Sequence, residues 1–411
     1  MHYLAFGDEK LKKTGKNSAI LWLLSIAGFL AIFSTTISKN PVLSLFVAGL
    51  GGNASILGVI AAISPIAGIL FSFPIGFMAD KIGPKKLLVA AGLIFVTAPL
   101  LYLTITNPIW LIPIRFFHGI GTAILGPVAA MIIFRHYPKK KGERFGIYSS
   151  ATLFGRTLAP IAGGAIISYF AIKGGLIQYK MVYVAALIAA IPVLILIMLL
   201  KEEKNSGEGR KLSFHDFQKA LMDFVSERHL VGTSLAQMSA YFAFGAFETY
   251  LPILLSGRGF PAYQIGLIFS VQVLSIAISQ PLFGRISDKI DRRIQIEAGL
   301  ITLGIAIALV TSAPSIQMLI ALSVLFGFGL SFATVATSAY VADVVPKERT
   351  GTSVGVLSAI MDVGHSSGPF FTGLMITAIS IKAGFLLSLA LCIAVAIIFG
   401  ICTRGPAKWK K

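Results

Sequence analysis

Charged residues are scarce in this sequence. Of its 411 residues only 13% are charged, whereas 56% are hydrophobic, and the mean hydropathy is +0.84. Soluble chains are usually about one quarter charged. The scarcity of charge excludes an ordinary soluble domain and indicates a protein embedded in a lipid bilayer.

Acidic residues are scarcer still, with 17 Asp and Glu against 35 Lys and Arg, a formal net charge of +18. A basic chain can bind nucleic acid, but most basic residues here lie in short segments that fall on one side of a membrane if helices alternate. The segments on the other side receive only Lys39, Lys173, Lys180, Arg258 and Lys382. This is the positive-inside pattern, so we expect both termini in the cytoplasm. We expect a monomer in the plasma membrane. Its excess positive charge is expected to bind anionic lipid, and no nucleic-acid partner is expected.

Cysteine is almost absent. Cys392 and Cys402 lie in the last apolar run, and ten helical residues would separate them by about 15 Å, too far for a disulfide. The sequence also lacks a phosphate-binding glycine loop, a nucleophile motif and any Cys/His spacing typical of a metal site. We therefore expect no cofactor, no bound metal and no enzymatic activity.

Long apolar runs dominate what is present. A membrane-spanning helix takes roughly 20 mainly apolar residues, and the chain offers twelve such runs, which predicts an all-α membrane protein. The runs lie near residues 18–38, 55–78, 86–105, 109–133, 146–170, 181–200, 230–255, 262–283, 294–313, 316–340, 352–379 and 383–402.

The twelve runs form two sets of six that repeat each other. Gly119 and Gly121 match Gly327 and Gly329 at an offset of 208 residues. We expect two pseudo-symmetric six-helix bundles, residues 1–200 and 229–411. Residues 201–228 form the expected cytoplasmic linker, in which apolar residues at helical spacing indicate an amphipathic helix on the membrane surface; the alternative is a plain linker.

The connection between the second and third runs carries a motif, Gly-x-x-x-Asp-Lys-x-Gly-x-Lys-Lys. Its residues are Gly76, Asp80, Lys81, Gly83, Lys85 and Lys86, and a weaker copy around Asp288 has Asp291 in place of the second glycine. The pattern resembles the loop signature of the major facilitator superfamily, a family of secondary transporters, and the resemblance spans nearly the whole chain. It implies that Asp80 and Asp288 are gating residues that help to close the cytoplasmic side, while Lys85 and Lys86 could simply fix the topology.

The fourth run also resembles the family, with Arg115 three residues before His118 and a glycine pair after it. A charged residue within the bilayer must face a cavity or a partner, so Arg115 is a candidate for substrate binding or proton coupling. The alternative for Arg115 is a side chain that reaches the interface, and for His118 it is a hydrogen-bonded packing role.

The fifth run resembles the antiporter signature Gly-x-x-x-Gly-Pro-x-x-Gly-Gly, with Ala159 in place of the second glycine. Its matching residues Gly155, Pro160, Gly163 and Gly164, and the copy Gly368 and Pro369, are expected to pack helices closely. In the family this motif is associated with export by antiport. Arg156, within the motif, lies near the middle of its helix and needs an anionic partner there.

Only two acidic residues lie well inside the predicted spans, Glu248 and Asp362. Both are candidates for carrying protons, and His365 shares a helix face with Asp362. A fixed salt bridge between Asp362 and Arg156 is the alternative, and the two roles are compatible.

The sequence thus predicts a secondary transporter that moves a small organic solute by alternating access. Proton-driven export is the first choice because of the motif in the fifth run. The alternatives are a proton-coupled symporter of an organic carboxylate, favoured by Arg115 and Arg156, and a transporter-like membrane receptor that does not cycle.

Overall fold

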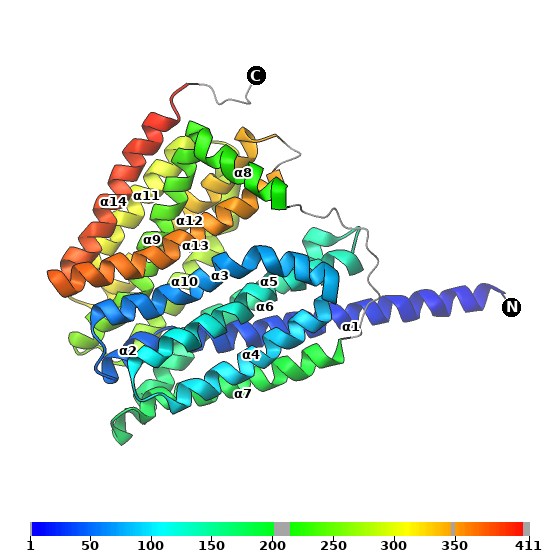
Figure 1. Ribbon diagram of the computed structural model, residues 1–411, viewed down its shortest axis with the longest axis horizontal. Helices are drawn as coiled ribbons and strands as arrows, with labels where there is room; N and C mark the ends of the chain where they lie inside the picture. The colour runs from blue at the N-terminus through cyan, green and yellow to red at the C-terminus, as the bar shows by residue number, and fades with distance from the viewer. Residues whose placement is uncertain (1, 201–213, 347–349, 406–411) are drawn as a thin grey trace.

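A computed structural model describes residues 2–200, 214–346 and 350–405 of the chain (Figure 1). Side chains are described for these ranges apart from residues 2–18, 72–73, 76–77, 80, 214–217, 219–220 and 351. The described residues are almost entirely helical and contain no strand. Residues 201–213 of the expected linker, and the side chains of Gly76 and Asp80, lie outside the described part of the protein.

Twelve long helices correspond to the twelve predicted spans, which confirms the predicted fold class. They are α1 (His2–Ile37), α3 (Ala54–Ile82), α4 (Pro84–Thr104), α5 (Leu111–His136), α6 (Lys141–Phe170), α7 (Ile177–Leu199), α9 (Arg228–Gly257), α10 (Ala262–Ser287), α11 (Arg292–Val310), α12 (Ile316–Val344), α13 (Thr350–Ala378) and α14 (Ile381–Cys402). Eleven of them, all except α13, contain a span that is long and apolar enough to cross a membrane. The middle of α13 carries Asp362, His365 and two serines.

The first membrane span is broken, which the sequence reading did not predict. The helix predicted to end near residue 38 is followed, after a turn at residues 38–41, by a second helix, α2 (Val42–Gly49), within the same apolar span. Pro41 has no backbone N–H to continue the helical ladder, so a helix break here has a local cause. Residues 42–47 of α2 are buried, so the span continues into the protein and Lys39 lies at the break instead of in an external loop.

The helices pack into two groups, shown in blue to green and in green to red in Figure 1. Helices α1 and α3–α7 contact one another, as do α9–α14, and the groups meet mainly where α3 packs on α13 and α6 packs on α10. We call them the first and second bundles. Glycine permits the closest of these approaches: a Cβ atom at Gly164 of α6 would overlap the backbone of Ala262 at the start of α10.

The connections at the two ends of the bundles differ in charge. One end, which we call the basic end, carries most of the Lys and Arg residues of the connections and includes connections 82–84, 136–141, 287–292 and 344–350. The opposite end includes connections 49–54, 104–111, 170–177, 257–262, 310–316 and 378–381. The short helix α8 (Phe214–Ser226) lies at the basic end and packs on α9 and α13. Its Leu221, Met222 and Val225 are exposed, whereas Phe224 is buried.

The two bundles are hydrogen-bonded to each other toward the opposite end. Ser44 Oγ donates to Thr249 O at 2.7 Å, Tyr250 OH donates to Ala54 O at 2.9 Å, and Ser55 Oγ lies 2.7 Å from Thr377 Oγ1. Tyr263 N–H donates to Ser168 Oγ at 3.0 Å. Together with the bonds of Lys39 and Asn40 to Glu248 nearer the middle of the helices, these contacts hold the bundles together toward the opposite end, which we call the closed end.

Candidate functional site

A polar cluster joins the two bundles around the carboxylate of Glu248 in α9. Lys39 Nζ lies 2.6 Å from Glu248 Oε2, and Asn40 Nδ2 donates to Glu248 Oε1 at 2.9 Å. His365 Nε2 of α13 lies 3.0 Å from Glu248 Oε2. Three groups from two bundles therefore hold one carboxylate, which is how a charge buried at this depth is satisfied.

A proton in this cluster can occupy more than one position. His365 Nε2 lies 3.2 Å from Lys39 Nζ as well as 3.0 Å from Glu248 Oε2. One ring nitrogen cannot donate to the carboxylate and accept from the ammonium at the same time. Moving one proton between these groups therefore changes which hydrogen bonds hold the bundles together.

The helix break at residues 38–41 places Lys39 and Asn40 in this cluster. Sequence reasoning predicted Glu248 and His365 as site residues but assigned Lys39 to an external segment. One signal could have found it: Glu248 needs a cation, and Lys39 is the one basic residue inside the apolar stretch of residues 19–49. Non-helical backbone at membrane depth is tolerated where it lines a cavity or is buried in protein, so the break is itself a mark of the site.

Arg115 and His118 of α5 are buried inside the first bundle. The side chains are nearly inaccessible, at 2% and 1% exposure. His118 lies 3.3 Å from Tyr102 OH and 3.4 Å from Thr35 Oγ1, and Arg115 Nε has no hydrogen-bond partner. The Arg115 side chain is therefore enclosed by protein and does not extend to the membrane surface. His118 has the contacts of a hydrogen-bonded packing residue.

Arg156 and Asp362 do not form the salt bridge that the sequence suggested. Both side chains are described, and neither belongs to any ion pair. Arg156 is exposed, whereas the Asp362 carboxylate lies against α3, where a Cβ atom at Gly68 would come within 3.1 Å of its Oδ2. The buried ion pair of this region is Lys39–Glu248 instead.

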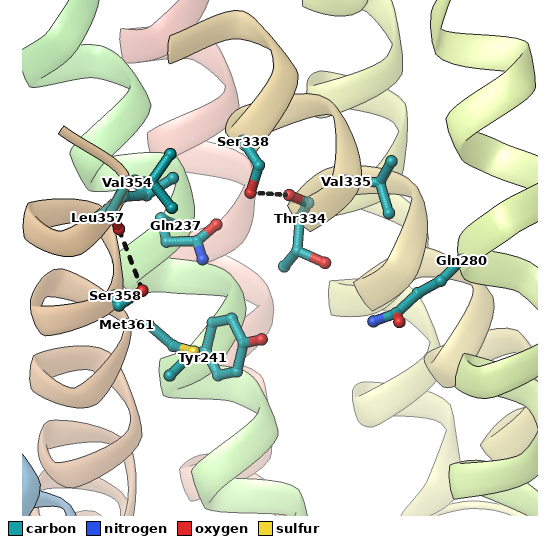
Figure 2. Close-up of a pocket in the computed structure, with 10 residues that line it drawn as sticks. All are labelled: Gln237, Tyr241, Gln280, Thr334, Val335, Ser338, Val354, Leu357, Ser358 and Met361. Carbon is teal, nitrogen blue, oxygen red and sulfur yellow. Dashed lines mark hydrogen bonds between the residues drawn. The ribbon is translucent and has the colours of Figure 1, made fainter. Parts of the chain in front are cut away.

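A cavity of about 380 Å³ opens in the second bundle on the side of the basic end (Figure 2). Its lining comes from α9, α10, α12 and α13 and carries no charged side chain: Gln237, Tyr241, Gln280, Thr334, Val335, Ser338, Val354, Leu357, Ser358 and Met361. Tyr241 also lies beside His365, with ring centroids 6.3 Å apart. The cavity therefore adjoins the polar cluster and can hold an uncharged molecular surface with hydrogen-bonding groups.

The small residues of α6 and α13 make the close helix contacts. A Cβ atom at Gly155 would overlap the backbone of α1 at Phe29, and one at Gly163 would press on Ile37, next to the helix break. Gly164 faces Ala262, and Gly368 lies against the backbone of Phe242 in α9. After Pro160, the N–H of Ile161 donates to Ser270 Oγ of α10 at 3.1 Å. Pro369 O lies 2.8 Å from Tyr250 OH and shares its one hydroxyl proton with Ala54 O.

The loop motifs lie at the basic end. Gly83 adopts φ +93°, a conformation that favours glycine, at the start of α4. Its counterpart Asp291 accepts from Arg293 N–H at 2.8 Å, which makes it the N-cap of α11 and explains why an acid replaces the glycine. Asp288 and Asp343 both pair with Arg292, so the contacts of Asp288 stay within the second bundle in this structure.

Comparison with known proteins agrees with this architecture. A family model described as Major Facilitator Superfamily matches residues 24–270 and 233–411. An uncharacterised MFS-type transporter of Methanocaldococcus jannaschii is 21% identical over 388 residues, 94% of this chain and 98% of that protein. A homologue of the multidrug resistance efflux pump PmrA from Lactococcus lactis is 24% identical over 377 residues, 90% of each chain. Among solved structures, an inward-facing, unoccupied bacterial homologue of the human lysosomal transporter Spinster superposes with a TM-score of 0.76 at 18% identity, covering 94% of this chain and 95% of that one. With this coverage, the chain belongs to the Major Facilitator Superfamily.

Proposed function

We propose that this protein is a secondary active transporter that exports a small organic solute in exchange for protons. The observation that carries the proposal is the position of Glu248, a carboxylate of the second bundle held by Lys39 and Asn40 of the first. A proton on this carboxylate removes its charge and weakens its hold on Lys39. Proton binding and separation of the bundles at the opposite end are thereby linked.

The proposed orientation places the basic end in the cytoplasm of a cell whose plasma membrane holds the protein, with both termini inside. The closed end then faces outward, and the structure corresponds to an inward-facing form. The cavity in Figure 2 would be reached from the cytoplasm, where a solute to be exported is bound.

The proposed moving units are residues 1–200 and 229–411, which rock about the contacts of α3 with α13 and of α6 with α10. Residues 201–228 connect them. Glu248, Asp362 and His365 are the proposed proton-carrying groups, and no enzymatic step is part of the cycle. Export is supported by the small-residue motif in α6, which lies at the bundle interface, and by relatives named as multidrug resistance efflux pumps.

Symport of an organic anion is the second candidate. Basic side chains outnumber acidic ones in the interior, where Lys39, Arg115 and Arg156 accompany Glu248 and Asp362. This observation bears on the charge of the solute and is compatible with either direction of transport. A non-cycling receptor is the third candidate, and only a flux measurement separates it from the other two.

The test is a flux assay in everted membrane vesicles that contain the full-length chain. The vesicles are energised to an acidic lumen, and ethidium and a fluorescent carboxylate are offered in turn. Proton-driven export predicts that one dye accumulates in the lumen and that Glu248→Gln or Asp362→Asn abolishes the accumulation. Accumulation in right-side-out vesicles instead would establish symport, and no gradient-dependent flux in either orientation would leave the receptor.

A further inference from the structure

Basic side chains outnumber acidic ones in the interior between the two ends. Lys39, Arg115 and Arg156 are the basic residues there, and Glu248 and Asp362 are the acidic ones. Even with both carboxylates ionised, one positive charge is left without a compensating negative charge. An arginine within a membrane span is costly without a compensating anion.

Arg115 and Arg156 both lie outside the ion pairs of the described side chains, but Arg115 is buried inside the first bundle, whereas Arg156 is exposed. Arg156 lies two turns along α6 from Gly163 and on the same face, and a Cβ atom at Gly163 would lie 3.6 Å from Asn40 O at the helix break. Lys39, by contrast, is occupied by Glu248 at 2.6 Å. Two cations of the first bundle therefore lie beside the helix break, and one of them, Lys39, is paired with a carboxylate of the protein itself.

We propose that Lys39 and Arg156 form the binding site for a carboxylate group of the transported solute, and that Glu248 occupies Lys39 in this structure in place of that group. The planar fork of Arg156 suits a carboxylate, and the ammonium of Lys39 supplies a compact second charge. The inference rests on the proposed transport function and specifies its substrate class.

The uncharged part of the solute fits beside this anion site. Tyr241 lines the cavity of Figure 2, and its ring lies 6.3 Å from the ring of His365, which contacts both Lys39 and Glu248. The other side chains that line the cavity are also uncharged. The solute class is therefore an organic carboxylate whose body is uncharged and aromatic or hydroxylated.

Exchange of Glu248 for a solute carboxylate would also affect the closure of the opposite end. The Lys39–Glu248 ion pair joins the first bundle to the second. Glu248 keeps Asn40 and His365 as partners when Lys39 turns to the solute. Solute binding thus removes the ionic contact between the bundles, and the freed state is the one that binds the solute better.

The experiment measures binding, so that it is independent of transport. The purified full-length chain is titrated with benzoate and 2-naphthoate, and with benzamide and 2-naphthamide as uncharged analogues of the same shape. The variants are Lys39→Met, Arg156→Gln, Glu248→Gln and the charge-neutral pair Lys39→Met with Glu248→Gln. The matched control is Lys382→Met, because Lys382 is an exposed lysine at the start of α14.

The carboxylates are expected to bind and the amides not. Lys39→Met and Arg156→Gln should each weaken carboxylate binding by about tenfold or more, and Glu248→Gln should strengthen it by about tenfold because the internal competitor is gone. The neutral double variant should melt like the unmodified protein and still bind poorly, which separates loss of the site from loss of the fold. Lys382→Met should bind normally.

Equal binding of amides and carboxylates, no binding of either at millimolar concentration, or weaker binding in Glu248→Gln would overturn the proposal. If the carboxylates do not bind as expected, but a proton gradient still drives ethidium export that depends on Glu248, the anion site is rejected and the proposed function stands. Carboxylate binding without proton-coupled flux rejects the proposed function and leaves the anion site standing.

Discussion

Lys39 Nζ and Glu248 Oε2 lie 2.6 Å apart although 209 positions separate them in the chain. Lys39 follows α1 at a helix break, Glu248 lies in α9, and their side chains are only 20% and 10% exposed. A buried ion pair adds little net stability compared with an apolar pair, but loss of one partner leaves a costly uncompensated charge. The pair is therefore better suited to specifying one arrangement of the bundles than to stabilising the fold.

The first prediction is a double-mutant cycle on this pair. Lys39→Met should lower the free energy of unfolding by about 3 kcal/mol, near the lower limit for buried pairs because both side chains keep some exposure. Adding Glu248→Gln should restore most of the loss, since the stranded carboxylate is then neutral. Thermal unfolding of the purified variants in detergent measures both effects, with Lys382→Met as the exposed control.

Strict additivity of the two substitutions would show that Lys39 and Glu248 do not interact in the folded protein. Additivity is the normal outcome only for residues that share no partner. The cycle therefore tests the contact itself, independently of any solute.

The second prediction concerns Arg156 and Asp362. Because neither side chain belongs to an ion pair, Arg156→Gln and Asp362→Asn should change stability additively, each by less than about 1 kcal/mol. Proton-driven flux should nevertheless be lost in Asp362→Asn, since an amide carries no titratable proton. A strong coupling in unfolding measurements would mean that a conformation with an Arg156–Asp362 bridge dominates in solution.

How far the sequence predicts the site can be judged from Glu248 and Lys39. Scarcity of acids inside apolar runs was enough to single out Glu248 and Asp362, because burial makes such residues expensive. Lys39 was missed because the positive-inside rule treats a lysine between two apolar runs as a loop residue. Pro41 is a local signal for the helix break, but the burial of residues 42–47, which keeps Lys39 inside the protein, is not reported by hydropathy.

The fold was easier to predict from the sequence than the site. Twelve apolar runs and a repeat of 208 residues predict two sets of six helices, since a bilayer demands helices of a fixed minimum length. The sequence did not predict which basic residue pairs with which carboxylate. Arg156 and Asp362 lie on repeat-equivalent helices, yet the Asp362 carboxylate lies beside Gly68 of α3, where a Cβ atom would come within 3.1 Å of its Oδ2.

The third prediction concerns the basic end. If Asp80 helps to close the cytoplasmic side, Asp80→Asn should keep the fold, slow transport and expose the cavity more often. A single cysteine at Ser358, introduced after Cys392 and Cys402 are replaced by alanine, lines the cavity and reports exposure through its rate of maleimide labelling. Asp291→Asn is the matched control, because asparagine caps a helix about as well as aspartate. Equal labelling rates and equal flux in the two variants would remove the gating role from Asp80.

The last prediction uses two glycines of the same helix, Gly164 and Gly146 of α6. A Cβ atom at Gly164 would overlap the carbonyl of Ala262 on α10, whereas a Cβ atom at Gly146 would meet nothing within 4 Å. Gly146→Ala should therefore be neutral or stabilising by up to about 1 kcal/mol, the gain expected from helix propensity alone. Gly164→Ala should cost about 1–3 kcal/mol because backbone must move to make room.

The two variants should also differ in conformation. Displacement of α10 by Gly164→Ala would strain the hydrogen bond from Ile161 N–H to Ser270 Oγ and loosen the closed end. Spin labels at Lys173 and Lys382, exposed positions on the two bundles at that end, should then report longer distances in Gly164→Ala and unchanged distances in Gly146→Ala. If Gly164→Ala kept both the stability and the distance distribution of the unmodified protein, the contact of α6 with α10 would not hold the end closed, and the hydrogen bonds of α2 and α3 with the second bundle would have to do so by themselves.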